Sequence, residues 1–317
     1  MQKKVLNVLF VTNMYPDDSH PNLGIFVKEQ IELLSRELES FGLINMSKPK
    51  NWLVKYGLTL PSVLRCILSR RYNIIHVHFG LTAVVIIPFI LLIRLFRIRT
   101  VITFHGTDVV GKNRLGTAIS KFAASLLDLS ICVSDDIQKI ISKYSKHAVK
   151  ISCGISEEFF DDRPKIERQK LIIFPSDPDR KEKNFQLFKR TLDRVQQHIP
   201  EVSFICLKNL TKNEVIEHMN RAKCLLMTSL YEGSPQTVKE AIICDLPVVS
   251  TPAGDVPNLL KGLPGCAIGK NEDELVEAVL AILNTVEDYH YPKEVKRKFS
   301  NFETCNRIIH CYNQLIN

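Results

Sequence analysis

Residues 223–244 read KCLLMTSLYEGSPQTVKEAIIC. The run begins with apolar residues typical of a buried strand, passes through a short polar loop and ends in a stretch with helical spacing. Ser234 is a residue that commonly caps a helix, and Pro235 is favoured at the first helical position. The segment therefore predicts a strand, a loop and a helix, which is the repeating unit of a parallel α/β sheet.

The same unit recurs along the 317 residues of the chain. Strand-like runs at 5–11, 74–79, 100–106 and 129–134 are each followed by a helix-like stretch. A polar segment at 157–170, which contains Pro164, interrupts the alternation, and KLIIFP then restarts it. We therefore predict an α/β protein of two tandem Rossmann-like domains that face a cleft, over residues 1–160 and 161–301.

Composition and missing motifs disfavour several classes of protein. The nine cysteines are odd in number and include no C-x-x-C pair, which favours reduced cysteines in a cytoplasmic protein over a disulfide framework or a zinc site. No signal peptide is recognised. Neither domain carries the G-x-G-x-x-G fingerprint, so a plain dinucleotide dehydrogenase is disfavoured.

Positive charge is concentrated in the first half. Residues 1–160 hold 20 Lys and Arg against 12 Asp and Glu, whereas the remainder holds 22 of each. The excess predicts an anionic partner, either nucleic acid, a membrane surface or a phosphorylated substrate, and a solvated basic face is the alternative. No aromatic stacking motif or recognition helix supports nucleic acid.

One apolar segment, LTAVVIIPFILLI (81–93), resembles a membrane span in composition only. It is shorter than the roughly 20 residues that a span needs, so we predict a buried helix against the sheet. The residues that follow it, Arg94, Arg97 and Arg99, would suit a surface that lies on anionic lipid.

Two glutamates flank the helix predicted after Pro235. The first-turn amides of Gln236 and Thr237 would form an anion site at the carboxyl end of a parallel strand. Glu232 precedes this site and Glu240 follows it, and a carboxylate can accept two hydroxyl hydrogen bonds from a sugar. The ligand that this pattern describes is a nucleotide-diphosphate sugar; the alternative is that both glutamates are ordinary surface charges.

The segment SLYEGSPQTVKEAIICDLPVVSTPAGDV (229–256) resembles the donor-binding region of retaining GT-B glycosyltransferases of family 4, the glycosyl transferases group 1, of the bacterial surface-polysaccharide type. Other stretches resemble the family in the same order: YPDDSHPNLGIFVKEQIELL, IIHVHFGL, VITFHGTDV, ISCGISEEFF, FPSDPDRKEKNFQL and FETCNRIIHCYNQL. The last of these implies a C-terminal helix, 302–317, that crosses back to the first domain.

The resemblance implies a role for each matching residue. His105 and Glu232 would be catalytic, and Asp108 would face the acceptor or orient its loop. The implied donor-binding residues are Gly24, Arg180, Lys183, Gly233, Ser234, Pro235, Gln236, Thr237 and Glu240. Lys183 and Arg180 would neutralise the leaving diphosphate, a task that the transition state requires in the absence of a metal.

Several residues depart from the family pattern or leave alternatives open. Arg180 stands only three residues before Lys183, closer than in the commonest form of the family, which leaves its role open. Asp177 and Asp179 have the D-x-D spacing of metal-dependent enzymes, but a turn is the favoured interpretation. We interpret His76 and His78 as structural and leave Asp255 open.

The first domain is shorter than is usual in the family. Residues 38–72 leave room for one strand and one helix, and the acceptor side would lie there, near Trp52 and the basic residues Lys48, Lys50 and Lys55. A saccharide or polyprenyl-diphosphate-linked acceptor at the inner face of the cell membrane would suit this region. Donor base, sugar and linkage stay open.

We therefore predict a hexosyltransferase-type glycosyltransferase that needs no metal or other cofactor and uses a nucleotide-diphosphate sugar in cell-surface polysaccharide synthesis. It would be cytoplasmic, with peripheral membrane contact through its basic half and no nucleic-acid partner. The alternatives are a catalytically inactive GT-B module that binds a nucleotide sugar or scaffolds a partner enzyme, and a UDP-sugar 2-epimerase, for which we find no acid/base set.

Overall fold

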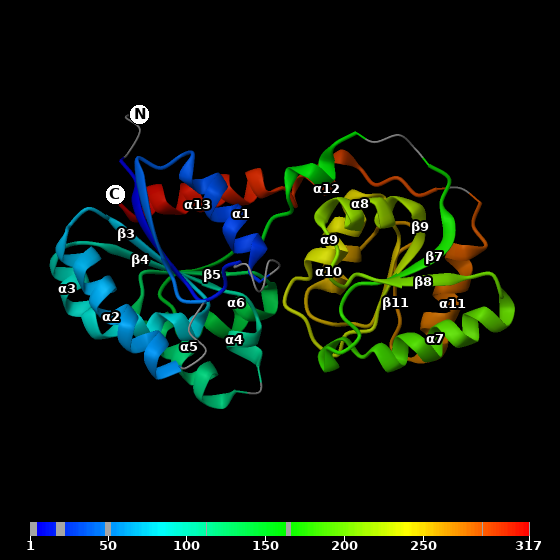
Figure 1. Ribbon diagram of the computed structural model, residues 1–317, viewed down its shortest axis with the longest axis horizontal. Helices are drawn as coiled ribbons and strands as arrows, with labels where there is room; N and C mark the ends of the chain where they lie inside the picture. Colours follow the sequence, from blue (N-terminus) through cyan, green and yellow to red (C-terminus); the bar gives the residue numbers. More distant parts are fainter. Residues whose placement is uncertain are drawn as a thin grey trace. The chain divides into compact units, whose positions relative to one another are not determined.

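The computed structural model describes residues 5–16, 23–47, 52–111, 113–162, 166–286 and 288–316 (Figure 1). The chain divides into two compact units, which we call unit 1 (residues 1–154 and 301–317) and unit 2 (residues 155–300). The predicted domain bounds, 1–160 with the helix 302–317 and 161–301, stay predictions.

Unit 1 is built on a sheet of six parallel strands in the order β2-β1-β3-β4-β5-β6. The strands are β1 (Asn7–Thr12), β2 (Ser40–Asn45), β3 (Ile74–His78), β4 (Arg99–Phe104), β5 (Leu129–Cys132) and β6 (Ala148–Lys150). All four strands predicted in this half are confirmed. β2 and the helix after it also fill the space between residues 38 and 72, as the sequence predicts.

Side chains of each strand alternate between two apolar cores because successive residues point to opposite faces of a sheet. On β1, Leu9 and Val11 enter one core, whereas Val8 and Phe10 enter the other. The first core is covered by α2 (Trp52–Leu68), η1 (Gly80–Val85), η2 (Ile87–Phe89), α3 (Ile90–Leu95), α4 (Thr107–Val110), α5 (Arg114–Leu126) and α6 (Asp135–Ile141).

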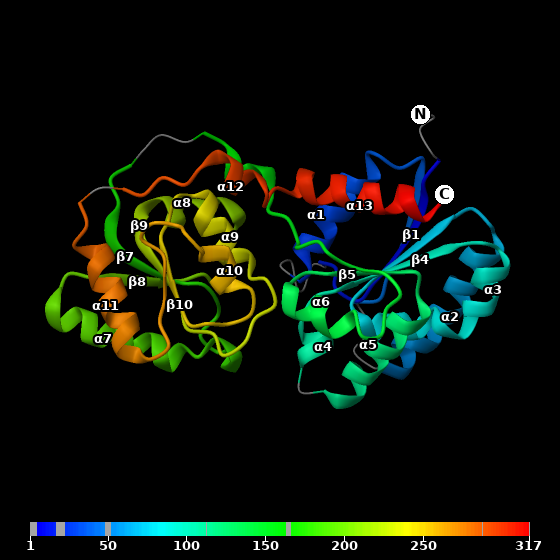
Figure 2. The ribbon, with the colours of Figure 1, turned by 180° about the vertical axis from the view of Figure 1, so that it is seen from behind.

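The second core is covered by α1 (Ile25–Ser35) and by α13 (Asn301–Leu315), which lie side by side in Figures 1 and 2. Ile308 and Tyr312 of α13 are fully buried in it. The last helix of the chain thus packs in unit 1, which confirms the predicted crossing back.

Residues 81–93 do not form the single buried helix that the sequence predicts. Pro88 lies in a run of two 3₁₀ helices, η1 and η2, and only the last part continues as α3. Pro lacks the N–H that a continuous helix needs, which accounts for the break. Ile93 is buried, but Leu91 and Leu95 face solvent. Among the helices that the structure describes, none combines the length and apolar character needed to cross a membrane.

Unit 2 has a sheet of five parallel strands in the order β11-β10-β9-β7-β8. They are β7 (Gln169–Phe174), β8 (Ser203–Cys206), β9 (Ala222–Met227), β10 (Val248–Ser250) and β11 (Ala267–Ile268). The helices are η3 (Glu157–Phe160), η4 (Lys181–Lys183), α7 (Phe185–His198), α8 (Lys212–Arg221), α9 (Gln236–Ile243), α10 (Val256–Leu260), α11 (Glu272–Leu283) and α12 (Lys293–Arg297).

The two faces of this second sheet are also buried. Helices α7 and α11 pack over one core, and α8, α9 and α10 pack over the other. The predicted strand, loop and helix at residues 223–244 are β9, its loop and α9. Two domains with parallel sheets, as predicted, are therefore confirmed.

Candidate active site

The carboxyl ends of β7, β9 and β10 meet at one edge of the sheet of unit 2, because these strands are parallel neighbours. The Thr228 hydroxyl donates to the carbonyl oxygens of Lys183 and Asn184, at 3.1 and 3.0 Å. The Thr251 hydroxyl donates to the carbonyl of Ser229 at 2.6 Å. Three strand-end loops are thus tied together, and most of the predicted donor-binding residues lie on them.

Lys183 and Glu232 form an ion pair that the sequence analysis did not foresee. Lys183 Nζ lies 2.6 Å from Glu232 Oε1, and the Ser229 hydroxyl donates to the same oxygen at 2.6 Å. The two charged side chains are only 11% and 12% exposed. Sequence reasoning assigned them to different parts of the donor, yet they are direct partners although 49 residues separate them.

Arg180 lies on the same loop but is more exposed. Its guanidinium contacts the Glu182 carboxylate, with Nε and Nη2 at 2.8 and 2.6 Å from Oε1. Burial acts to raise the pKa of Glu182, but a backbone hydrogen bond and the charges of Arg180 and Lys183 outweigh it and lower this pKa. Its predicted role at the diphosphate stays a prediction.

Both aspartates of the D-x-D pair, Asp177 and Asp179, form ion pairs with Lys208. Lys208 Nζ lies 2.9 Å from Asp177 Oδ1 and 2.9 Å from Asp179 Oδ2, and the amide of Asp179 donates to Asp177. This amide bond and Lys208 lower the pKa of Asp177. The geometry is that of a turn closed by an ion pair, in line with the favoured interpretation.

Helix α9 begins one residue later than predicted. Its first residue is Gln236, and Pro235 occupies the cap position without a side-chain cap. The Ser234 hydroxyl instead donates to Asp255 Oδ2 at 3.4 Å, so it is not the helix cap. The first-turn amides, which include those of Gln236 and Thr237, have no acceptor inside the helix by geometry.

The turn after β10 packs against the loop that carries Glu232 and Gly233. Gly254 has φ +57°, and a Cβ atom there would lie 2.4 Å from the carbonyl oxygen of Glu232. The Asp255 amide donates to the carbonyl of Gly233 at 3.0 Å. The buried Asp255 carboxylate also accepts from Asn258, so this residue holds the loop that carries Glu232.

Glu240 lies within α9 and is half-buried, as is Gln236. Between them, Lys239 is fully buried, and its Nζ lies 3.4 Å from Gln236 Oε1. The sequence analysis assigns this lysine no role.

In unit 1, His105 follows β4 and packs against the Phe26 ring at 5.3 Å. Its Nε2 lies 3.4 Å from His78 Nδ1, and its Nδ1 lies 3.6 Å from Cys153 Sγ. Burial lowers the pKa of His105 to about 4, so the imidazole is neutral at neutral pH. Cys153 Sγ is a weak hydrogen-bond partner, so a ligand hydroxyl could replace it.

Asp108 is buried and acts on the backbone. Its carboxylate accepts from the amides of Gly80 at 2.9 Å, Gly106 at 2.8 Å and His105 at 3.1 Å. Burial raises the pKa of Asp108, whereas these amide bonds act to lower it. This geometry supports the loop-orienting alternative; its acceptor-side role stays a prediction.

Gly24 precedes α1 with φ +65°, and a Cβ atom would lie 2.4 Å from the carbonyl oxygen of Met14. The backbone alone therefore requires a glycine. Its donor-binding role stays a prediction, and so do the roles of Gly233 and Pro235. Lys48 and Lys50, placed near the acceptor by the sequence analysis, lie outside the described residues.

His76 and His78 are both fully buried on β3. His76 Nδ1 lies 2.5 Å from the Tyr312 hydroxyl and Nε2 lies 2.7 Å from the Thr103 hydroxyl, which supports the structural interpretation. In the part of the chain that the structure describes, no group of three His, Cys, Asp or Glu side chains could hold a metal ion.

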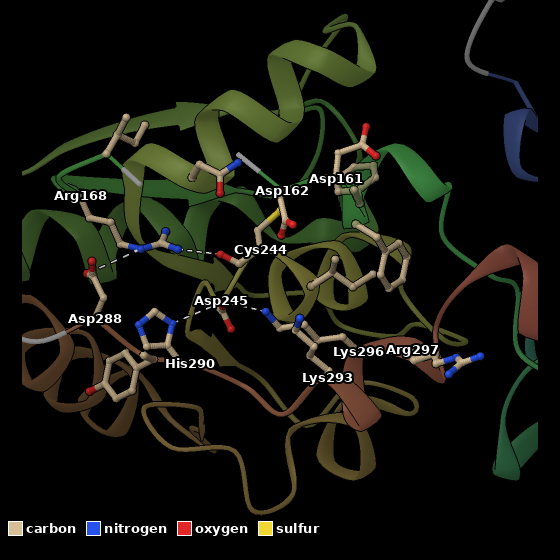
Figure 3. Close-up of a pocket in the computed structure, with 16 residues that line it drawn as sticks. Asp161, Asp162, Arg168, Cys244, Asp245, Asp288, His290, Lys293, Lys296 and Arg297 are labelled. Carbon is tan, nitrogen blue, oxygen red and sulfur yellow. Dashed lines mark hydrogen bonds and ion pairs between the residues drawn. The ribbon is translucent and has the colours of Figure 1, made fainter. Parts of the chain in front are cut away.

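A hollow of about 670 Å³ in unit 2 lies at the other end of α9 (Figure 3). Arg168 donates to three backbone carbonyls there, including that of Cys244, and faces Asp288 at 3.7 Å. Asp245 pairs with Lys296 at 2.7 Å. Because these charges bind one another and the backbone, we assign no ligand to this hollow.

The chain matches two family models. The Glycosyltransferase Family 4 model matches residues 6–159, and the Glycosyl transferases group 1 model matches residues 159–285. A comparison with curated proteins found no match.

Solved structures share the fold. Sucrose-phosphate synthase from Thermosynechococcus elongatus has a TM-score of 0.74 at 13% identity, over 98% of this chain and 99% of that one. HepE from Anabaena, in complex with UDP and glucose, has a TM-score of 0.73 at 13% identity, over 98% and 100%. A glycosyltransferase from Rickettsia africae has a TM-score of 0.68 at 13% identity, over 99% of each chain.

The fold and the strand-end loops define a GT-B protein, and the matched models make the chain a glycosyltransferase, an enzyme that transfers glycosyl groups. Within that class, its first half has the family 4 domain and its second half the group 1 domain. The predicted fold and enzyme class are confirmed.

Proposed function

We propose that this glycosyltransferase takes its sugar from a nucleotide-diphosphate sugar and retains the anomeric configuration without using a metal ion. The acceptor would be a saccharide or a polyprenyl-diphosphate-linked sugar in cell-surface polysaccharide synthesis. HepE, which shares the fold, has been solved with UDP and with UDP-glucose, and this supports the choice of donor class.

The cluster of Lys183, Glu232 and Ser229 carries the proposal. Both hydrogen bonds to Glu232 reach Oε1, and no bond to Oε2 occurs among the described residues. Oε2 can therefore accept a sugar hydroxyl while Oε1 stays bound. Lys183 has three N–H donors, so it can keep Glu232 and still reach a phosphate oxygen. One pair would thus hold the sugar and stabilise the leaving diphosphate.

Helix α9 would complete the donor site. A diphosphate at its amino end would receive the first-turn amides and the favourable end of the helix dipole. Glu240, on the next turn, would bind the ribose hydroxyls. The first-turn amides of α9 and Lys183 would together supply the positive potential that a metal supplies in other glycosyltransferases.

Thermal unfolding in the presence of UDP-, GDP-, ADP- and CMP-sugars tests the donor site. A donor at 100 times its Kd stabilises the folded state by about 2.7 kcal/mol. We expect one nucleotide family to raise the midpoint, with and without EDTA. Glu240→Ala should weaken that shift, whereas Glu277→Ala, the same change at an exposed position of α11, should not.

The outcomes separate the alternatives. A shift that EDTA removes and Mn²⁺ restores would show that the site needs a metal. A shift without turnover on any acceptor would favour the inactive module that binds a nucleotide sugar. An inverted product, read from the anomeric signal of the new linkage by NMR, would overturn retention.

We further propose that the enzyme works at the inner face of the cell membrane. Residues 40–107 contain nine Lys and Arg and no Asp or Glu. On α3, Leu91 and Leu95 are 76% and 73% exposed, and Arg94 lies beside them one turn along. Exposed leucines among arginines suit a lipid surface better than a nucleic acid.

The arginines continue this surface around the end of α3. Arg94, Arg97 and Arg99 line a hollow of about 490 Å³, and the Arg70 guanidinium lies 4.2 Å from the centre of the Phe96 ring. Each basic residue near an anionic bilayer contributes about 1 kcal/mol to binding.

Sedimentation with vesicles tests this surface. We expect binding to vesicles that contain phosphatidylglycerol and not to phosphatidylcholine alone. The double variant Leu91→Ser and Leu95→Ser should bind at least tenfold more weakly, whereas Val286→Ser, at a 92% exposed apolar position of unit 2, should bind like the unchanged protein. Equal binding of all three proteins would exclude α3 as the contact.

A further inference from the structure

Three histidine rings of unit 1 are stacked in a column. The His76 and His78 rings lie 4.4 Å apart with planes 23° from parallel, and the His78 and His105 rings lie 5.6 Å apart with planes 19° from parallel. Tyr312 of α13 closes the column at the far end, edge-on to His76. The column connects a helix at the end of the chain with the histidine that we expect to act in transfer.

The column is uncharged at neutral pH. Burial, with a smaller contribution from the neighbouring histidines, lowers the pKa of His76 to about 3 and the pKa of His78 well below its usual value. A neutral imidazole carries one N–H and one bare nitrogen. His76 satisfies both of its nitrogens, because the Tyr312 and Thr103 hydroxyls can each donate or accept.

His78 has only one partner for its two nitrogens. Its Nδ1 lies 3.4 Å from His105 Nε2, and its buried Nε2 has no hydrogen-bond partner among the described residues. One proton must lie between Nδ1 of His78 and Nε2 of His105. If His105 supplied it, His78 would carry its own proton on Nε2, where a buried N–H without an acceptor is costly.

We infer that His78 is a positioning residue for His105. Its Nδ1–H donates to His105 Nε2, and this bond holds His105 as the tautomer that carries its proton on Nδ1. That proton faces Cys153 Sγ at 3.6 Å, a weak acceptor that an oxygen of a ligand can replace. His105 would then present an N–H donor to a sugar oxygen. This last step rests on the proposed function.

The surroundings of the column support a fixed tautomer. Phe10 packs against both His76 and His78, and Phe26 packs against His105. Asp108, a carboxylate near the column, is bound to backbone amides, including that of His105. Its oxygens are therefore already occupied and do not compete for the proton between His78 and His105.

Two substitutions at position 78 distinguish hydrogen bonding from packing. Asn places an amide near the position of Nδ1, whereas Gln places it near Nε2 and is closer to histidine in volume. We expect His78→Asn to keep the turnover number within about threefold of the unchanged enzyme. His78→Gln and His78→Phe should lower it by about tenfold to a hundredfold, less than the roughly hundredfold to ten-thousandfold that a proton-transferring group itself contributes, with the donor KM unchanged.

A second readout does not depend on catalysis. ¹⁵N NMR of histidine-labelled full-length protein reports which nitrogen of each ring carries the proton, and His105→Gln identifies the signals of that ring. We expect a single Nδ1–H tautomer of His105 in the unchanged protein and in His78→Asn, and a mixture in His78→Gln and His78→Phe. His310→Phe, at an exposed position of α13, should leave the signals unchanged.

A proton on Nε2 of His105 in the unchanged protein would overturn the inference, as would a His78→Gln variant at least as active as His78→Asn. If the protein transferred no sugar at all, the proposed function would fail, but the NMR experiment would still decide whether His78 fixes the tautomer.

Discussion

The strand-end edges of the two units handle charge in opposite ways. In unit 2, Lys183 and Glu232 are held as an ion pair with about a tenth of each side chain exposed. In unit 1, the corresponding edge carries neutral histidines, and Asp108, a buried carboxylate there, is bound to backbone amides. The charged pair of unit 2 is positioned where a ligand could reach it, whereas the charge of Asp108 in unit 1 is bound by the backbone.

This difference fits the two tasks of a sugar transfer. A departing diphosphate needs fixed positive charge. A hydroxyl that becomes bonded to the sugar needs a positioned, uncharged hydrogen-bonding group more than it needs a cation. Both edges belong to the same kind of parallel sheet, so under the proposed function the division of tasks would come from the loops and not from the fold.

The largest effect should follow from removing the cation of unit 2. We expect Lys183→Met to lower turnover about a thousandfold, because it removes a charge-stabilising donor and leaves Glu232 without its partner. Steady-state kinetics would measure it. Lys181→Met, on the same short helix η4 but at an exposed position, is the control and should change turnover less than threefold. Equal losses in both variants would mean that only the net charge matters.

Removing the charge of Asp108 should affect stability most. Asp108→Asn keeps the shape but presents an amide N–H to backbone amides that need an acceptor. We expect the free energy of unfolding to fall by about 2–4 kcal/mol, measured by denaturant titration. Asp136→Asn, in which the carboxylate is 66% exposed, should change it by less than about 0.5 kcal/mol. A small effect at Asp108 would place this residue at the acceptor and not in the loop.

Lowering the pH should destabilise the protein mainly through the buried histidines of unit 1. The folded-state pKa values of His76 and His105 are lowered to about 3 and about 4 from 6.5. Between pH 6.5 and pH 4 the unfolded state therefore binds more protons, and stability falls as the pH falls through this range. We expect a decreasing thermal midpoint below pH 6.5, and a shallower slope in His78→Phe because one buried histidine is removed. Identical slopes would contradict this expectation.

Gly254→Ala should have the smallest effect and should act on unit 2. The new methyl group would meet the carbonyl oxygen of Glu232, and the backbone there has φ +57°. We expect a loss of about 1–2 kcal/mol in stability and weaker donor binding, since the loop of Glu232 must move. Gly57→Ala on α2, where no atom lies within 4 Å, should stabilise the protein by about 0.5–1 kcal/mol. Calorimetry would measure both.

Sequence reasoning predicted the main strands of both sheets because they are apolar runs followed by helix-like stretches, and it predicted where α9 begins to within one residue. The short strands β6 and β11 were not predicted. It did not predict the partners of the site residues. Lys183 and Glu232 pair across two loops, and Ser234 bonds Asp255 in place of its own helix. Such contacts depend on how loops from separate strands come together, which no local pattern records.

The column of histidines could not be predicted from the sequence. His76 and His78 could be placed on one side of a strand from their spacing, but His105 follows the next strand and Tyr312 lies near the end of the chain. For the apolar run at 81–93 the prediction was wrong. Its composition predicted one buried helix, whereas the run is divided at Pro88, and Leu91 and Leu95 are exposed.

Because α13 belongs to unit 1 but follows unit 2 in the chain, the order of synthesis matters. A ribosome completes every strand of the first sheet, and then all of unit 2, before it makes the helix that covers Val8, Phe10 and Ile31. Until then this apolar face lacks Ile308 and Tyr312. Unit 2 can finish folding while unit 1 still waits for its last helix, so a nascent chain is most vulnerable to aggregation through the half that is made first.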